Sequence, residues 1–210
     1  AASPHWSEQR GELIAATPLT ARREQWLNTW PGEKAASAGW LPGWSSCPKA
    51  DGAVPPGCVA ALEVAADRSC FGAAAAWRDG DGPVRVVSRV SGSLQAALAV
   101  LEGWQPAVVM AGASLAAQAQ GAWRTVPAGL KESRVATPWL ADAVRRGLIA
   151  HDHDEETARQ FGWARTALVE SGELVSAKRS KGPVPGVKAA MWAAVAAGEE
   201  WHGSEEAMIW

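Results

Sequence analysis

The stretch CVAALEVAADRSCFGAAAAW, residues 58–77, constrains the fold more than any other part of the sequence. It contains two apolar runs that are separated by the short polar turn Asp67-Arg68-Ser69. Apolar runs of this length, joined by turn residues, predict a hairpin of two buried β-strands. We therefore expect such a hairpin to open the folded domain.

Glu63 is the one acid in the middle of the first apolar run. A buried carboxylate costs several kcal/mol unless it is paired or binds a metal ion. An acid inside a central strand is therefore a candidate functional residue. The alternative is a structural role, in which Glu63 lies on an exposed edge or pairs with Arg68 or Arg85, and the sequence leaves both interpretations open.

The composition limits the classes of protein to which the chain can belong. Its 210 residues are 48% apolar and 20% charged, which is typical of a globular protein with a sizeable core. The net charge of -2 means that any binding of nucleic acid would need a local basic patch. Three cysteines without a C-x-x-C pair argue against a zinc ribbon or a disulfide framework and favour a reducing cytosol. No apolar run is long enough to predict a transmembrane helix.

The front of the chain differs from the rest. Capping and apolar patterns predict helices over residues 8–16 and 21–29. The stretch 31–57 is rich in Pro, Gly, Ser and Ala and has no period, so we interpret it as an extended linker pinned by Trp40 and Trp44. We therefore expect a domain boundary after residue 56.

The domain proper, residues 57–210, begins with strands and then alternates strands with helices. Strands are expected at residues 58–66, 70–76, 84–90, 107–110, 123–126 and 173–177. Helices are expected at residues 94–104, with Ser91 or Ser93 as the cap, and at residues 115–122, 137–148, 151–168 and 185–197. Three leading antiparallel strands followed by this alternation predict an α/β fold of the RNase H-like kind, with a mixed five-stranded sheet flanked by helices on both faces.

Four segments resemble a known family. They are RREQWLNTW, LEVAADRSCFGAAAAW, ADAVRRGLIAHDHDEE and GPVPGVKAAMWAAVAA, and together they span nearly all of residues 20–197. They resemble, in that order, a helix beyond the ATPase domain, the first hairpin, a late helix before a polar loop, and the C-terminal helix of one domain. That domain is the nuclease domain of the large terminase subunit of tailed phages, particularly phages of actinobacteria.

The resemblance implies an activity and its partners. It implies endonucleolytic cutting of concatemeric phage DNA, with a cluster of carboxylates that holds two divalent ions, Mg²⁺ or Mn²⁺. It also implies double-stranded DNA, the phage portal, the small terminase subunit and an ATPase domain as partners, in the host cytoplasm during phage assembly. Because the chain has no Walker A motif, residues 1–56 would be the remnant of the connection to that ATPase domain.

The acid cluster of the family carries over only in part. Glu63 stands in the place of the family's first-strand aspartate, and Asp67 matches the acid in the following turn. The family's second acid belongs at the end of the fourth strand, but residues 109–112 hold no carboxylate. Its third acid belongs shortly before or in the C-terminal helix, and residues 184–187 hold none either.

A neighbouring polar loop offers replacements. Its acids are Asp152, Asp154 and Glu155. The expected catalytic residues are therefore Glu63, Asp67 and Asp154. The expected metal ligands are Glu63, Asp67, Asp152 and Asp154. His151 or His153 could bind a metal or transfer protons. The alternative is that these acids are solvated helix caps beside exposed histidines.

Basic residues in two places are candidates for contact with DNA phosphates. They are Lys178, Arg179 and Lys181 in one loop, and Arg145 and Arg146 at the end of a helix. Lys188, in an otherwise apolar helix, could point toward the same groove. The alternative for all of them is a solvated face.

Three hypotheses remain at the level of sequence. The first is a metal-dependent DNA endonuclease domain of a terminase. The second is a catalytically degenerate RNase H-like module that binds DNA or docks on the portal, which the two missing acids favour. The third is an unrelated α/β enzyme, but the chain has no G-x-G-x-x-G, P-loop or G-x-S-x-G motif.

Overall fold

The computed structural model describes residues 39–169 and 172–199. A compact unit begins at Gly39. The two helices predicted over residues 8–16 and 21–29 lie outside the described residues, so they stay predictions. Among the residues that are described, no helix is both long and apolar enough to cross a membrane.

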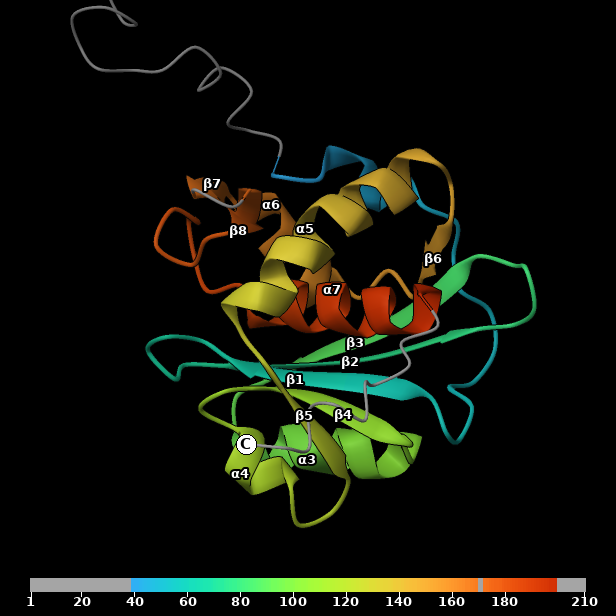
Figure 1. The fold of residues 1–210 in the computed structure, drawn as a ribbon, viewed down its shortest axis with the longest axis vertical. Coiled ribbons are helices and arrows are strands. Elements are labelled where there is room, and N and C mark those ends of the chain that lie inside the picture. Colours follow the sequence, from blue (N-terminus) through green and yellow to red (C-terminus); the bar gives the residue numbers. More distant parts are fainter. Residues whose placement is uncertain (1–38, 170–171, 200–210) are drawn as a thin grey trace, which may run out of the picture. The chain divides into compact units, whose positions relative to one another are not determined.

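A six-stranded mixed sheet forms the centre of the unit, in the order β5-β4-β1-β2-β3-β6 (Figure 1). The strands are β1 Val59–Val64, β2 Phe71–Arg78, β3 Val84–Ser91, β4 Val108–Gly112, β5 Arg124–Ala128 and β6 Ile149–His151. Strands β1 to β3 form an antiparallel meander, β4 runs parallel to β1, and β5 runs parallel to β4. The predicted RNase H-like α/β arrangement is confirmed.

The sheet has one strand more than predicted. Strand β6 pairs in parallel with the start of β3. A helix was expected to begin at His151, but that residue ends β6, and helix α6, Glu155–Trp163, begins only after it. The apolar residues Ile149 and Ala150 are buried against the edge of β3, which explains why the chain is extended there.

Helices cover both faces of the sheet (Figure 1). Helices α3, Leu94–Trp104, and α4, Ala116–Ala119, lie on one face. Helices α5, Leu130–Arg145, α6 and α7, Pro185–Gly198, lie on the other. Strands β7, Thr166–Val169, and β8, Gly172–Val175, form a separate hairpin.

Two helix starts show how terminal backbone donors are satisfied. The Ser93 hydroxyl accepts a hydrogen bond from the Ala96 N–H at 3.2 Å, as expected for a capped α3. Helix α5 begins seven residues before the predicted start at residue 137 and contains Pro138. There the Gly129 N–H donates to the Glu132 carboxylate at 2.7 Å, so a side chain inside the first turn satisfies a terminal backbone donor.

Helix α7 lies across the middle of the sheet and positions the site. Eleven of its fourteen residues are buried, and it packs mainly on β2, β1 and β3. Its first turn comes so close to β2 that a Cβ on Gly72 would lie 2.3 Å from the Gly186 nitrogen. Because Gly72 pairs with Glu63 across the β1–β2 hairpin, this contact brings the start of α7 next to Glu63.

Part of the linker that was predicted over residues 31–57 packs into the apolar core of this unit. It contains a short 3₁₀ helix, Pro42–Ser46, and Trp44 within it is only 2% exposed. The Trp44 ring stacks on the rings of His151 and Phe161, with 4.1 Å between ring centroids in both cases. The described part of the linker is therefore held against the domain by Trp44, as expected. The division of the chain after residue 56 stays a prediction.

Candidate functional site

A cavity of about 560 Å³ opens at the end of β1. Its walls come from the β1–β2 turn, the loop after β4, the loop that leads into α7, and the first turn of α7. Its charged and hydroxyl-bearing lining consists of Glu63, Asp67, Arg68, Ser114, Ser180, Lys181 and Lys188. Carboxylates and cations from segments far apart in the sequence therefore meet in one place.

Glu63 lies on an interior strand, because β1 is paired on both sides, by β4 and β2. Its side chain is half-buried, and its Oε1 accepts a hydrogen bond from the Val64 N–H at 3.0 Å. Burial raises the pKa of Glu63, while the Lys188 cation and the Val64 N–H act in the opposite direction. The alternative of an exposed edge is excluded, and Arg85 pairs with Asp79 at 2.6 Å instead of with Glu63.

The strand register identifies the position beside Glu63 on β4. Leu62 pairs with Ala111, so Gly112 is the next residue alongside Glu63. A Cβ on Gly112 would lie 2.6 Å from the Glu63 Oε2. The Glu63 carboxylate therefore occupies the space that a side chain at residue 112 would need. Ala111 is fully buried in the apolar cluster around α3, on the other face of the sheet.

The start of α7 also lacks an acid. Val184 and Pro185 line the cavity, whereas Gly186 does not. The Gly186 N–H donates to the buried Gln160 Oε1 at 2.8 Å, on the side of α6. Lys188 lies one turn after Val184, to whose carbonyl its N–H donates at 3.2 Å, and its side chain joins the cavity wall. Lys188 thus lies in the cavity as the sequence suggested.

Asp67 is the second expected acid that the fold brings to the cavity. It is exposed in the β1–β2 turn, and its Oδ1 accepts hydrogen bonds from the Ser69 hydroxyl at 2.7 Å and the Ser69 N–H at 3.0 Å. These hydrogen bonds lower the pKa of Asp67, the hydroxyl contributing most. Asp67 therefore carries a negative charge, which hydrogen bonds within the turn already stabilise in part.

Asp152 and Asp154 do not join Glu63, and that expectation has to be corrected. Asp152 follows β6 and pairs with Arg89. Strand β6 is three strand spacings from β1, or about 14 Å. Asp154 instead caps α6, where its Oδ1 accepts from the Thr157 N–H at 2.8 Å. The helix-capping interpretation of this acid is confirmed.

The two histidines of this loop do not reach the cavity either. The His151 Nε2 lies 2.8 Å from the Trp44 carbonyl oxygen, and the His153 Nε2 lies 3.1 Å from that of Cys47. His151 is buried rather than exposed. Both rings hold the segment before β1 against the domain.

The expected DNA-contacting residues fall into two groups. Lys181 lines the cavity, and Lys178 and Arg179 are exposed in the same loop. Arg145 and Arg146 pair with Asp142 at the end of α5, which leads into β6 at the opposite end of the sheet.

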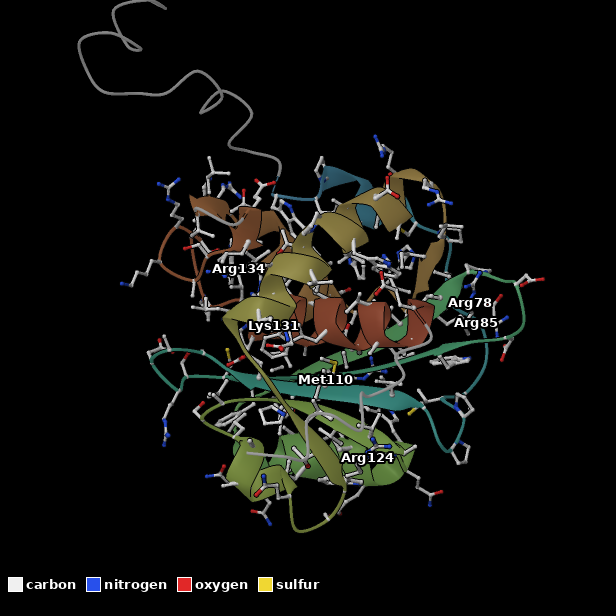
Figure 2. The ribbon with its side chains drawn as sticks, in the orientation of Figure 1. Arg78, Arg85, Met110, Arg124, Lys131 and Arg134 are labelled. Carbon is white, nitrogen blue, oxygen red and sulfur yellow. The ribbon has the colours of Figure 1, made fainter. Side chains whose placement is uncertain are left out.

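Other cations were not singled out from the sequence as site residues. Figure 2 shows Arg78 and Arg85 at that same opposite end, by the β2–β3 turn. Arg68, in contrast, lies in the cavity wall. Its only sequence signal was its place in the turn after Glu63.

These residues do not fit a two-metal centre. In the described ranges, 39–169 and 172–199, no three side chains of His, Cys, Asp or Glu lie together so that they could hold a metal ion. The cavity offers two carboxylates. One of them, Asp67, accepts hydrogen bonds from Ser69, and the Lys188 ammonium is close enough to act on the charge of the other. A pair of divalent ions needs more oxygen ligands than this.

Comparison with known proteins bears on the fold. No protein-family model matches the sequence, and no curated protein matches it. Among solved structures, the large terminase of bacteriophage HK97 superposes with a TM-score of 0.61 at 13% identity, over 73% of this chain and 42% of that chain. The chain has the terminase nuclease fold. It spans less than half of the HK97 protein.

Two further structures are similar to parts of the same fold. The large terminase nuclease of thermophilic phage G20c has 13% identity and a TM-score of 0.49, over 71% of this chain and 91% of that chain. The same nuclease with bound magnesium has 16% identity and a TM-score of 0.46, over 71% and 90%.

Proposed function

We propose that this chain is the nuclease-fold part of a phage DNA-packaging terminase and that it holds double-stranded DNA without cutting it. One observation carries the proposal. The cavity between β1, β4 and α7 is open to about 560 Å³, but the expected acid positions around it hold Glu63, Gly112 and the apolar pair Val184 and Pro185. The cavity thus holds the expected acids on β1 and in the β1–β2 turn, Glu63 and Asp67, but lacks those expected on β4 and at the start of α7.

Hydrolysis of a phosphodiester by two metal ions depends on closely placed carboxylates that hold both ions. Here Glu63 is the carboxylate that β1 brings to the cavity, and Lys188 is close enough to act on its charge. Lysines are good ligands for phosphate. The charges of the cavity thus favour binding of a nucleic-acid backbone over assembly of a metal centre.

A second candidate function is a metal-dependent endonuclease that cuts concatemeric DNA with Mg²⁺ or Mn²⁺. It is favoured by the position of Glu63, whose carboxylate lies in the cavity with Asp67. In this candidate, Glu63 and Asp67 would be the ligands, with DNA or water supplying the others. The absence of carboxylates at residues 112 and 184–185 weighs against this candidate.

The experiment that decides between the two is incubation of supercoiled plasmid with the purified chain in Mn²⁺ or Mg²⁺, beside a Glu63→Ala variant. We expect DNA to be retarded on a gel by the wild-type chain without nicking. Nicking that disappears in Glu63→Ala would overturn the non-cutting proposal and establish the endonuclease. A chain that neither binds nor cuts would overturn both.

The proposal implies the setting of a packaging motor. The chain would work in the host cytoplasm during phage assembly, next to an ATPase domain, the portal and the small terminase subunit. Co-purification of the chain with these proteins from infected cells is the measurement that tests this part. Failure of the chain to associate with any of them would contradict it.

A further inference from the structure

Lys188 is a charged residue on an otherwise uncharged and largely buried helix. Helix α7 has no other charged residue, and the residues on both sides of Lys188 are buried. Lys188 is only partly buried and lines the cavity. A cation kept on a core helix at this one position points to a ligand or a counter-ion in the cavity.

Glu63 is the nearest candidate for the counter-ion, but the two side chains are not in contact. Lys188 is close enough to act on the charge of Glu63. Yet Lys188 and Glu63 take no part in the ion pairs found in the described portion of the chain. The Glu63 carboxylate instead bends over Gly112 and accepts from the Val64 N–H. The ammonium group of Lys188 is therefore available to an anion that enters the cavity.

The rest of the wall suits an anion as well. Lys181 and Arg68 join Lys188, so three cations face two carboxylates. The loop that carries Lys181 is tied down, because the Lys181 N–H donates to the Trp163 carbonyl at 3.0 Å and the Ser180 hydroxyl accepts from the Arg165 N–H at 3.0 Å. The loop backbone that carries Lys181 is therefore already fixed and loses little freedom when a ligand binds.

We infer that the cavity binds a phosphate of the DNA backbone without a metal ion, with the Lys188 ammonium supplying the positive charge that a metal would supply in a two-metal nuclease. This inference rests on the proposed function, since it takes duplex DNA as the ligand. It differs from that function in assigning the contact to Lys188 and in excluding a bridging metal.

The test is fluorescence anisotropy of a labelled DNA duplex with the full chain, in EDTA and in Mg²⁺. We expect binding in EDTA and no gain in affinity when Mg²⁺ is added. Lys188→Met should weaken binding about tenfold. It should also reduce the magnitude of the slope of log binding constant against log salt concentration by about 1. Lys188→Arg should bind nearly as well as the wild type. Lys49→Met, which removes an exposed lysine outside the cavity wall, is the control of equal charge change.

A double variant separates phosphate contact from mere neutralisation of Glu63. If Lys188 only offsets the Glu63 charge, Glu63→Gln combined with Lys188→Met will restore binding, which would overturn the inference. Binding lost in EDTA, or equal affinities of Lys188→Met and Lys49→Met, would also overturn it while leaving the proposed function intact. A wild-type chain that binds no DNA in either buffer would overturn both. Thermal melting of each variant shows whether a loss reflects unfolding.

Discussion

At the scale of single residues, two glycines shape the cavity by what they leave out. Gly112 makes room for the Glu63 carboxylate, and Gly72 lets the start of α7 lie directly on β2. At both positions the neighbouring atoms come so close that only glycine, which has no Cβ, fits. The position of the Glu63 carboxylate is thus tied to the residue beside it on β4.

Gly72→Ala should destabilise the fold. The new Cβ would lie 2.3 Å from the Gly186 nitrogen and 2.4 Å from the Pro185 carbonyl carbon, both backbone atoms of a buried helix end. We expect the free energy of unfolding to fall by about 1–3 kcal/mol, measured by urea denaturation. Gly103→Ala, in α3 with open space around it, should instead raise stability by up to about 1 kcal/mol. Equal stability of Gly72→Ala and the wild type would contradict the close packing of α7.

At the scale of elements, β6 and the segment before β1 hold each other through aromatic rings. His151 lies between Trp44 and His153, with ring centroids 4.1 and 4.2 Å away. The His153 N–H donates to the His151 Nδ1 at 3.0 Å, so the His151 Nε2 carries the proton that it donates to the Trp44 carbonyl. This arrangement requires a neutral imidazole.

The stability of the fold should therefore fall in mild acid. Burial lowers the pKa of His151, so the unfolded chain takes up a proton that the folded chain resists. Above a pH of about 6.5 both states are neutral and the contribution is complete; as the pH drops below that value, the free energy of unfolding decreases until the lowered pKa is reached. Urea denaturation between about pH 5 and 7 measures this slope.

The matched variant for this prediction is His151→Asn, which cannot titrate in that range. It should be less stable at all pH values, because packing against Trp44 is lost, but its stability should depend less on pH. An unchanged slope in His151→Asn would show that other groups cause the acid sensitivity.

At the scale of the whole molecule, the apolar core extends beyond the sheet and the helices that cover it. Leu41, Trp44 and Cys47 belong to the same apolar core as the residues of α7. Burial raises the pKa of Cys47 to about 11, as expected for a thiol in this environment. The stretch before β1 thus contributes to the core on the face of the sheet that α5 and α7 cover.

Trp44→Ala should remove much of that contribution. Its ring is 2% exposed and lies against Phe161 and His151, so its loss leaves a large cavity. We expect the free energy of unfolding to fall by about 3–5 kcal/mol. Trp40→Ala, at a partly exposed ring with a looser contact to Phe161 at 6.2 Å, should cost less. Similar losses in both variants would contradict the central role of Trp44.

The local sequence was sufficient for features that depend on neighbouring residues. The apolar runs around Asp67 predicted the first hairpin and a central strand with Glu63 on it. The serines at 91 and 93 predicted the start of α3, which Ser93 caps. Turns and caps form among residues close in sequence. The family likeness and the order of elements also led to the α/β fold that the structure has.

Only the tertiary structure decided which residues meet. The edge strand β6, three residues long, carries too short a pattern to be told from a helix start, and its pairing with β3 keeps Asp152 away from Glu63. The register between β1 and β4 put Gly112 beside Glu63, and the packing of α7 on Gly72 brought Lys188 to the same cavity. Residues 63, 112 and 188 are far apart along the chain, so their meeting depends on long-range strand pairing and helix packing that no local pattern encodes.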